Sequence, residues 1–276
     1  MSVARVNGVE LYYGLSGSGE PLVLVHGSWG DHHNWDSVVS PLADAFQVLV
    51  YDRRGHSASE RPAGQGSVFE DADDLAALID ELGVAPAHVA GNSFGAVIAL
   101  RAATRRPDVF RSLIVHEPPL FPLLAGTDLE PALSEVQRRI GAVAELLEGG
   151  DHEGAARLFV ETIAFGPGAW DGQLTPEMRE VFVANAPTFL DEVRDPDALQ
   201  MDLDALSGFG RPALLTSGTT SAPFFGPVVD MVGSSLPRAE RVTIDGADHV
   251  PHISVPERYV ELLSAFIRTG RSGPPQ

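Results

Sequence analysis

Five residues, Gly91-Asn92-Ser93-Phe94-Gly95, stand at a junction between two hydrophobic periods and constrain the fold more than any other part of the chain. Before them, His88-Val89-Ala90 is a short strand-like run, and after them residues 96–100 open a helical pattern. A serine flanked by glycines at a strand-to-helix junction is typical of a nucleophile elbow, in which small neighbours let strand and helix approach closely. The bare pattern is weak, because 28 of the 276 residues are glycine, so the rest of the chain must supply the context.

Eight short apolar runs along the chain predict β-strands. The first two, residues 4–6 and 9–13, flank Asn7-Gly8, which is the strongest short signal for a hairpin. The other runs are residues 21–25, 46–51, 88–90, 113–115, 212–216 and 241–244. Helical patterns separate most of them, as at residues 35–45, 69–82 and 256–268. This alternation predicts an α/β protein with an eight-stranded, mostly parallel sheet and helices on both faces.

The alternation is interrupted once, between Glu117 and Arg211. This stretch contains only helical patterns and many of the bulky side chains; the patterns lie at residues 131–147, 153–163, 176–185 and 188–193. We therefore expect a helical lid, residues 119–207, inserted after the sixth strand of a core made of residues 1–118 and 208–276. The tail from Thr269 to Gln276 is rich in Gly and Pro, and we expect it to be disordered.

The composition is that of a soluble globular protein, with 44% hydrophobic residues and no apolar run of about 18 residues that would cross a membrane. The formal net charge of −19 predicts repulsion from nucleic acids and from anionic membranes. The N-terminus lacks the apolar core of a signal peptide, so a cytoplasmic location is the default expectation. We expect a small-molecule substrate as the partner, and we leave a homodimer open. The absence of cysteine excludes disulfides and cysteine-ligated metals.

Four motifs follow predicted strands, where a parallel sheet gathers its functional loops. They are Leu24-Val25-His26-Gly27, Asp52-Arg53-Arg54-Gly55-His56-Ser57, the turn around Ser93, and Gly246-Ala247-Asp248-His249. Together, and in this order, they resemble the α/β-hydrolase family over about residues 5–268. The resemblance implies the α/β-hydrolase fold, with the lid as its least constrained part, and a structural bracing role for the loop that begins at Asp52.

Ser93 is the candidate nucleophile, and His249 is the candidate general base. His249 follows the last predicted strand, where members of the family carry their histidine. Its task is to take the Ser93 proton and to pass it to the leaving alkoxide. His252 is a nearby rival, but the Gly-x-x-His spacing after residues 242–244 favours His249.

The third member of the triad departs from the common family pattern. Most relatives carry an aspartate shortly after the penultimate strand, but the stretch Gly218-Thr219-Thr220-Ser221 holds no carboxylate. The chain resembles the zearalenone-type lactone hydrolases, whose His-Glu-x-Pro stretch is matched here by His116-Glu117-Pro118-Pro119. This resemblance implies that Glu117 is the triad acid. A lid-hinge or helix-capping role for Glu117 is the alternative, and the acid would then be Asp248, Asp245 or Asp230.

A serine nucleophile needs two preorganised N–H groups that point at the developing oxyanion. One is expected from Phe94, directly after the nucleophile. By family position the other is expected from Ser28, with Trp29 as the second choice. The side chains expected to contact the substrate are Trp29, His32, Phe121, Phe165 and Trp170. We expect no cofactor, because no Gly-rich phosphate loop follows the first strands, and no metal, because no cluster has metal-ligand spacing.

These residues predict a cofactor-free serine hydrolase that cleaves a carboxylic ester or lactone through a Ser93-His249-Glu117 triad. The lid aromatics favour a bulky, mainly apolar substrate, and the resemblance at Glu117 favours a lactonase. Two other classes stay open. Related folds with a similar elbow hydrolyse carbon–carbon bonds or carry out other cofactor-free reactions, and a non-catalytic ligand-binding receptor would share the fold without needing all three side chains.

Overall fold

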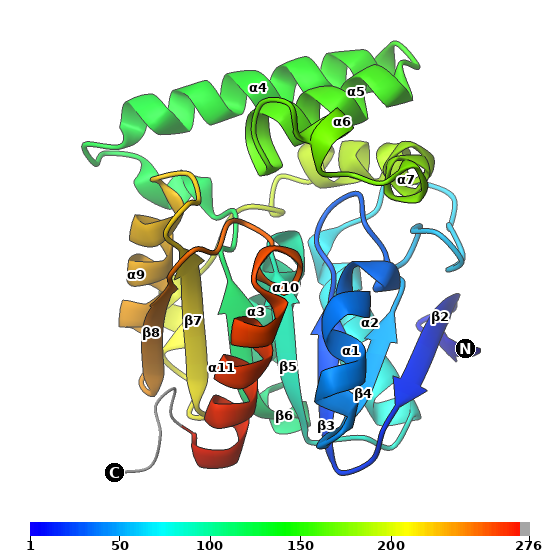
Figure 1. Cartoon of the computed structure of the whole chain (residues 1–276), viewed down its shortest axis with the longest axis vertical. Coiled ribbons are helices and arrows are strands. Elements are labelled where there is room, and N and C mark those ends of the chain that lie inside the picture. The colour runs from blue at the N-terminus through cyan, green and yellow to red at the C-terminus, as the bar shows by residue number, and fades with distance from the viewer. Residues whose placement is uncertain (271–276) are drawn as a thin grey trace.

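The computed structural model describes residues 1–270, which contain one eight-stranded sheet in the order β1-β2-β4-β3-β5-β6-β7-β8 (Figure 1). The predicted hairpin pairs β1 with β2, and β2 pairs antiparallel with β4, while the other neighbouring pairs are parallel. The strands are β1 (Ser2–Val6), β2 (Val9–Ser16), β3 (Glu20–Val25), β4 (Phe46–Tyr51), β5 (Ala87–Asn92), β6 (Phe110–His116), β7 (Ala213–Gly218) and β8 (Ala239–Ile244). The prediction of an eight-stranded, mostly parallel sheet is confirmed.

Helices cover both faces of the sheet, as the alternation of patterns predicts. On one face lie α1 (Asp36–Ala43) and α11 (Pro256–Thr269), which share an apolar cluster with the strands. On the other face lie α2 (Val68–Glu81), α3 (Phe94–Arg105) and α9 (Phe225–Ser235). Because helices cover both faces of the sheet, a functional site can form only at the ends of the strands.

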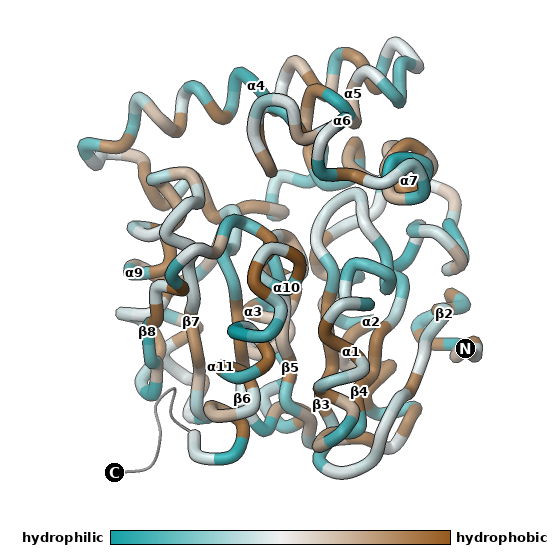
Figure 2. Tube along the Cα trace, viewed as in Figure 1, coloured by the Kyte–Doolittle hydropathy of each residue, from teal (hydrophilic) through white to brown (hydrophobic). Residues whose placement is uncertain are grey.

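Successive side chains of a central strand serve opposite faces of the sheet. Leu22 and Leu24 of β3 belong to the cluster with α1 and α11, while Val23 and Val25 belong to the cluster with α2, α3 and α9. All four side chains are completely buried. Burial on both faces explains why central parallel strands such as β3 and β4 are continuous apolar runs, which are largely brown in Figure 2.

A helical segment between His116 and Ala213 connects β6 to β7 and lies over the carboxyl ends of the strands (Figure 1); residues 119–207 of this segment are called the helical insert. Its elements are a 3-10 turn (Phe121–Leu124), α4 (Glu130–Glu148), α5 (His152–Phe159), a π-helical turn (Val160–Ala164), α6 (Ala169–Gly172), α7 (Pro176–Arg194) and α8 (Leu203–Leu206). The insert has an apolar cluster of its own, which includes Phe159, Trp170, Phe182 and Phe189.

Helix α7 differs from the sequence prediction, which has two helices separated near Pro187. The structure has one continuous helix with Pro187 inside it. A proline in a helix costs about 3 kcal/mol, because it removes one hydrogen bond and its ring crowds the preceding turn. Phe182 and Phe189 lie on either side of Pro187, and both are buried in the cluster of the insert. Keeping these two side chains on one face offsets the cost of the proline.

The remaining elements are α10 (Pro251–Ser254) and two 3-10 turns, His32–Trp35 and Pro107–Val109. Thr269, the first residue of the predicted disordered tail, is the last residue of α11, and residues 271–276 lie outside the described residues. Over residues 1–270, no helix is both long enough and apolar enough to cross a membrane.

Candidate active site

Ser93 occupies a strained turn between β5 and α3. Its backbone has a positive φ of 55°, which residues other than glycine rarely adopt. The N–H of Ser93 donates to the carbonyl of His116 at 2.9 Å. The flanking glycines are required by space. A Cβ on Gly91 would lie 2.3 Å from the carbonyl oxygen of Gly95, and one on Gly95 would lie 2.2 Å from that of Val25. The sequence therefore forms the sharp elbow that the Gly-x-Ser-x-Gly pattern predicts.

The structure brings His249 and Glu117 together. Nδ1 of His249 lies 2.7 Å from Oε2 of Glu117, and Oε1 of Glu117 accepts a hydrogen bond of 2.8 Å from the N–H of Gly218. Glu117 is completely buried and has a positive φ of 46°. Burial alone would raise the pKa of the Glu117 carboxyl, but the hydrogen bond from His249 and the nearby His116 hold it below its usual range. An ionised Glu117 fixes the ring proton of His249 on Nδ1, which leaves Nε2 free to accept a proton.

The other three carboxylates weighed for this role have different partners. Oδ1 of Asp248 accepts from the N–H of Val250, and the carboxylate of Asp245 lies 3.3 Å from Arg258 at the surface. The Asp230 side chain is 71% exposed, which a triad acid cannot be if it is to act in a low dielectric.

Two further side chains hold the loop that carries His249. The Asn92 amide donates to the carbonyl of His249 at 2.8 Å. Burial lowers the pKa of His116 to about 4, so this ring is neutral at neutral pH. Nε2 of His116 lies 3.1 Å from the carbonyl oxygen of Asp248, which only accepts, so Nε2 carries the proton and Nδ1 accepts from the hydroxyl of Thr216 at 2.8 Å. Asn92 and His116 thus hold the peptide groups on both sides of His249.

A cavity of about 390 Å³ separates the insert from the sheet, and both Ser93 and His249 line it. Phe94 and Ser28, the residues expected to form the oxyanion hole, line the same cavity. Its walls are mainly apolar and come largely from the insert; they include Phe121, Ile140, Phe159, Ile163, Phe189 and Leu199. The Phe225 ring stacks on the His249 ring with the centroids 4.5 Å apart. This cavity can enclose a bulky apolar molecule around Ser93.

The five side chains expected to contact the substrate lie in four different places. Phe121 lines the cavity, and Phe165 lines a neighbouring cavity that also reaches His249. Trp29 and Trp170 are buried in the apolar cluster of the insert instead, because the Trp29 ring packs among Phe159, Phe182 and Phe189. His32 faces Asp52 rather than the cavity.

Asp52 braces the loops beneath the site. Its Oδ1 lies 2.6 Å from Nδ1 of His32 and accepts from the N–H of His32, and its Oδ2 accepts from the N–H of Ala58. Burial opposes a charged His32 ring, but the bond to Asp52 raises the pKa of His32 overall. Asp31, His32 and Asp52 bring their ligand atoms within 4.8 Å of one another, as a metal site would require. The carboxylates accept internal hydrogen bonds at these positions, including one to Asp31 from the hydroxyl of Ser57, so we assign them a bracing role.

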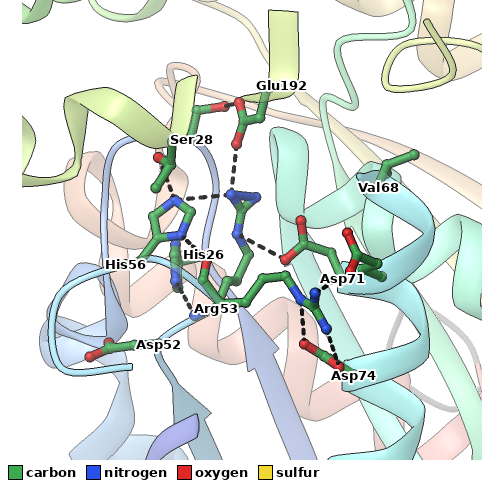
Figure 3. Close-up of polar contacts among 12 residues, drawn as sticks. His26, Ser28, Asp52, Arg53, His56, Val68, Asp71, Asp74 and Glu192 are labelled. Atoms are coloured by element: carbon green, nitrogen blue, oxygen red, sulfur yellow. Dashed lines mark hydrogen bonds and ion pairs between the residues drawn. The ribbon is translucent and has the colours of Figure 1, made fainter. Parts of the chain in front are cut away.

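Sequence patterns do not single out Glu192, an acid of the insert that lines the cavity beside Ser28 (Figure 3). Its carboxylate accepts from the Ser28 hydroxyl at 2.5 Å and from Nη2 of Arg53 at 2.6 Å. Burial raises the pKa of Glu192 to about 7, although the Arg53 charge opposes this shift. Asp71 lies 3.9 Å from Arg53 on the other side, and burial raises its pKa to about 6. Glu192 is one of many acids in the helical patterns, and only the tertiary structure distinguishes it.

The model of the alpha/beta hydrolase family matches residues 22–262. Because this match covers most of the chain, the protein belongs to the α/β-hydrolase family.

The chain is 39% identical over 131 residues to YraK, an uncharacterized hydrolase of Bacillus subtilis strain 168. That match covers 46% of this chain and 48% of YraK, so the chain spans about half the length of this curated relative.

Solved structures that resemble nearly the whole chain include Est816 and an enol-lactonase. Est816 is described as an N-acyl homoserine lactone degrading enzyme; it is 25% identical with a TM-score of 0.77, and the match covers 96% of this chain and all 100% of Est816. The other is the enol-lactonase of Burkholderia xenovorans LB400, with 22% identity, a TM-score of 0.80 and coverage of 97% and 100%. At that identity, the second likeness establishes the shared fold alone.

Proposed function

We propose that the protein is a cofactor-free serine hydrolase that cleaves a carboxylic ester or lactone of a bulky, mainly apolar substrate. The observation that carries the proposal is the 2.7 Å contact between Nδ1 of His249 and the buried carboxylate of Glu117, because His249 lines the same cavity as Ser93. A pure binding protein has no need of a strained serine together with an oriented histidine, so this combination favours an enzyme.

In the proposed reaction the Ser93 oxygen attacks the carbonyl carbon while Nε2 of His249 takes the hydroxyl proton. The N–H groups of Phe94 and Ser28 stabilise the oxyanion of the tetrahedral intermediate. When the intermediate collapses, the carbon–oxygen bond of the ester breaks and the leaving alkoxide takes the proton from His249. Water then attacks the acyl-enzyme with His249 again as the base, which releases the carboxylic acid and restores Ser93.

Two observations support an ester or lactone as the substrate. The helical insert acts as a lid over a mainly apolar cavity of about 390 Å³, which suits an acyl chain or a fused ring system. Est816, similar over nearly the whole chain at 25% identity, is described as an enzyme that degrades N-acyl homoserine lactones. A lactone keeps its leaving alkoxide on the acyl group, so the whole ring-opened chain stays on Ser93 in the acyl-enzyme, and water then releases it as a single hydroxy acid.

A fluorophosphonate probe tests the nucleophile directly. We expect the wild type and the control Ser234→Ala, which changes an exposed serine of α9, to be labelled, and Ser93→Ala not to be labelled. An unlabelled wild type would contradict the serine mechanism and favour a receptor. A panel of p-nitrophenyl esters, lactones and β-diketones then separates the reaction classes, since turnover of the β-diketones alone would favour carbon–carbon hydrolysis.

A further inference from the structure

The loop that follows β3, Ser28-Trp29-Gly30, is held by the helical insert rather than by the sheet alone. The Ser28 hydroxyl donates to Glu192, and the Asn185 amide donates to the carbonyls of Trp29 and Gly30 at 3.1 and 3.0 Å. Both Asn185 and Glu192 belong to α7. The Trp29 ring adds a third attachment, because it is completely buried in the cluster of the insert.

The backbone of this loop would not keep its conformation without such contacts. Trp29 has a positive φ of 68°, and for a bulky side chain this is an outlier that persists only where the surroundings determine it. The loop also lies directly against the nucleophile, since a Cβ on Gly27 would be 3.0 Å from the Cβ of Ser93. A small shift of Ser28 or Trp29 would therefore change the position of the N–H groups expected to face the oxyanion.

Glu192 is in turn fixed from the core, as Figure 3 shows. Its second carboxylate oxygen accepts from Arg53, whose guanidinium is 1% exposed and lies over the Phe94 ring at 5.0 Å. The main-chain N–H of Arg53 donates to Nε2 of His26 at 3.0 Å. His26 lies just before the loop Ser28-Trp29-Gly30, which is called the oxyanion loop. The Glu192 carboxylate thus contacts Ser28 directly and is connected to Phe94 through the Arg53 guanidinium. Ser28 and Phe94 are the two residues whose N–H groups must point at the same oxygen atom.

We propose that Glu192 is a positioning residue through which α7 of the helical insert sets the geometry of the oxyanion hole. This inference rests on the proposed function, because it assigns Glu192 a task in the attack of Ser93 on a carbonyl. The oxyanion hole is then complete only while α7 is docked on the core. Glu192 acts through Ser28, and it need not touch the substrate itself.

The test compares Glu192→Gln, Ser28→Ala and the double variant with the wild type. Asp191→Asn is the matched control, because this neighbouring acid of α7 pairs with Arg61 at 3.3 Å and does not contact Ser28. The readouts are the rate at which a fluorophosphonate labels Ser93, kcat and KM for a p-nitrophenyl ester, and the melting temperature. The phosphonyl oxygen must enter the oxyanion hole, so the labelling rate reports on that hole without turnover.

We expect Glu192→Gln to slow both labelling and kcat by about 10- to 100-fold. Displacement of a catalytic group by about 1 Å can cost about 100-fold, and the effect should stay below the roughly 10²- to 10³-fold loss of a deleted oxyanion donor, because the N–H groups remain present. KM should change less than about threefold, because ground-state binding uses the apolar cavity. The double variant should label within about threefold of the slower single variant, because both substitutions remove the same Ser28–Glu192 hydrogen bond. Asp191→Asn should label within about twofold of the wild type.

Several results would overturn the inference. One is a Glu192→Gln variant that labels at the wild-type rate, and another is a double variant whose losses multiply, which would mean that Glu192 does not act through Ser28. If Glu192→Gln fails to fold, Ser28→Ala decides alone, because it keeps the Glu192–Arg53 pair and should still slow labelling about tenfold or more. A wild type that resists labelling would overturn the proposed function as well, whereas a labelled wild type with an unaffected Glu192→Gln overturns only this inference.

Discussion

Replacing Glu117 by glutamine tests the triad with almost no change in shape. Both oxygens of Glu117 accept N–H groups, one from Gly218 at 2.8 Å and one from His249 at 2.7 Å. Glutamine has only one acceptor oxygen, so its NH2 group must face one of these two donors. If the oxygen keeps Gly218, His249 must move its proton from Nδ1 to Nε2. Nε2 is the atom that has to receive the Ser93 proton, so this tautomer is inactive.

The expected loss follows from the population of that tautomer. Substitution of a triad acid by its amide lowers kcat by about 10⁴-fold in a serine hydrolase of a different fold, through the same tautomer change. At about 1.36 kcal/mol for each factor of ten, this corresponds to about 5 kcal/mol of transition-state stabilisation. The complete burial of Glu117 argues for the full effect, because no water can replace the lost acceptor.

The assay is steady-state hydrolysis of a p-nitrophenyl ester, with urea unfolding to verify that Glu117→Gln folds. Asp230→Asn is the control, because it removes an exposed carboxylate of α9 and should keep kcat within about twofold. A Glu117→Gln variant that keeps more than a tenth of the wild-type kcat would refute the reasoning. A loss of about 10⁴-fold in Asp248→Asn instead would assign the acid to Asp248.

A rescue variant separates the loss of the acid from damage to the loop. The Ser221 hydroxyl lies beside Glu117, lowers the pKa of its carboxyl, and occupies the stretch where most family members carry an aspartate. Adding Ser221→Asp to Glu117→Gln should raise kcat at least about tenfold above that of Glu117→Gln, because a carboxylate again faces His249. No recovery in a folded double variant would argue that a carboxylate introduced by Ser221→Asp cannot reach the ring.

The remaining predictions concern stability and the cavity. Burial lowers the pKa of His252 to about 3, so below pH 6.5 protons bind the unfolded chain more readily and destabilise the wild type. The free energy of unfolding of His252→Phe, measured by urea titration, should therefore rise by about 2 kcal/mol relative to that of the wild type when the pH is lowered from 8 to 5. An equal difference between the two proteins at both pH values would contradict this. Gly95→Ala should lower the free energy of unfolding by about 3 kcal/mol or more, because the added Cβ would lie 2.2 Å from a backbone oxygen. The control Gly141→Ala in α4, whose added Cβ meets nothing within 4 Å, should raise the free energy of unfolding by about 0.5–1 kcal/mol, and thermal unfolding measures both. Phe121 lines the cavity, so Phe121→Ala should lower kcat/KM about tenfold for p-nitrophenyl octanoate and much less for the short acetate ester. Equal losses for both esters would show that Phe121 does not contact the acyl chain.

Local rules were sufficient for much of this fold. The steric limit at Gly91 lies within the elbow, because its neighbour is the carbonyl of Gly95, and the buried strands follow from continuous apolar runs. The limit at Gly95 is tertiary, because it comes from the carbonyl of Val25 on β3. Helix α7 is the exception among the helices and strands, because the tertiary packing of Phe182 and Phe189 in the cluster of the insert overrules the local helix-breaking signal of Pro187.

The site depends on contacts that sequence periodicity does not contain. The Glu117–His249 contact joins residues 132 positions apart, and only a family resemblance points to it. The Ser28–Glu192 bond spans 164 positions, and no local pattern separates Glu192 from the surface acids around it. Trp29 is an aromatic residue in a functional loop, but its ring turns into the insert because Phe159, Phe182 and Phe189 offer it a complete apolar environment.

The attachment of α7 to the oxyanion loop has a consequence for engineering by domain exchange. Inserts such as residues 119–207 are natural units to transplant, because both of their ends leave the sheet and the three residues of the proposed triad stay behind. A foreign insert would still remove Asn185 and Glu192 and leave the strained Trp29 without its partners. Chimeras should therefore bind new substrates readily and turn them over slowly until these two side chains are grafted at matching positions of the incoming helix.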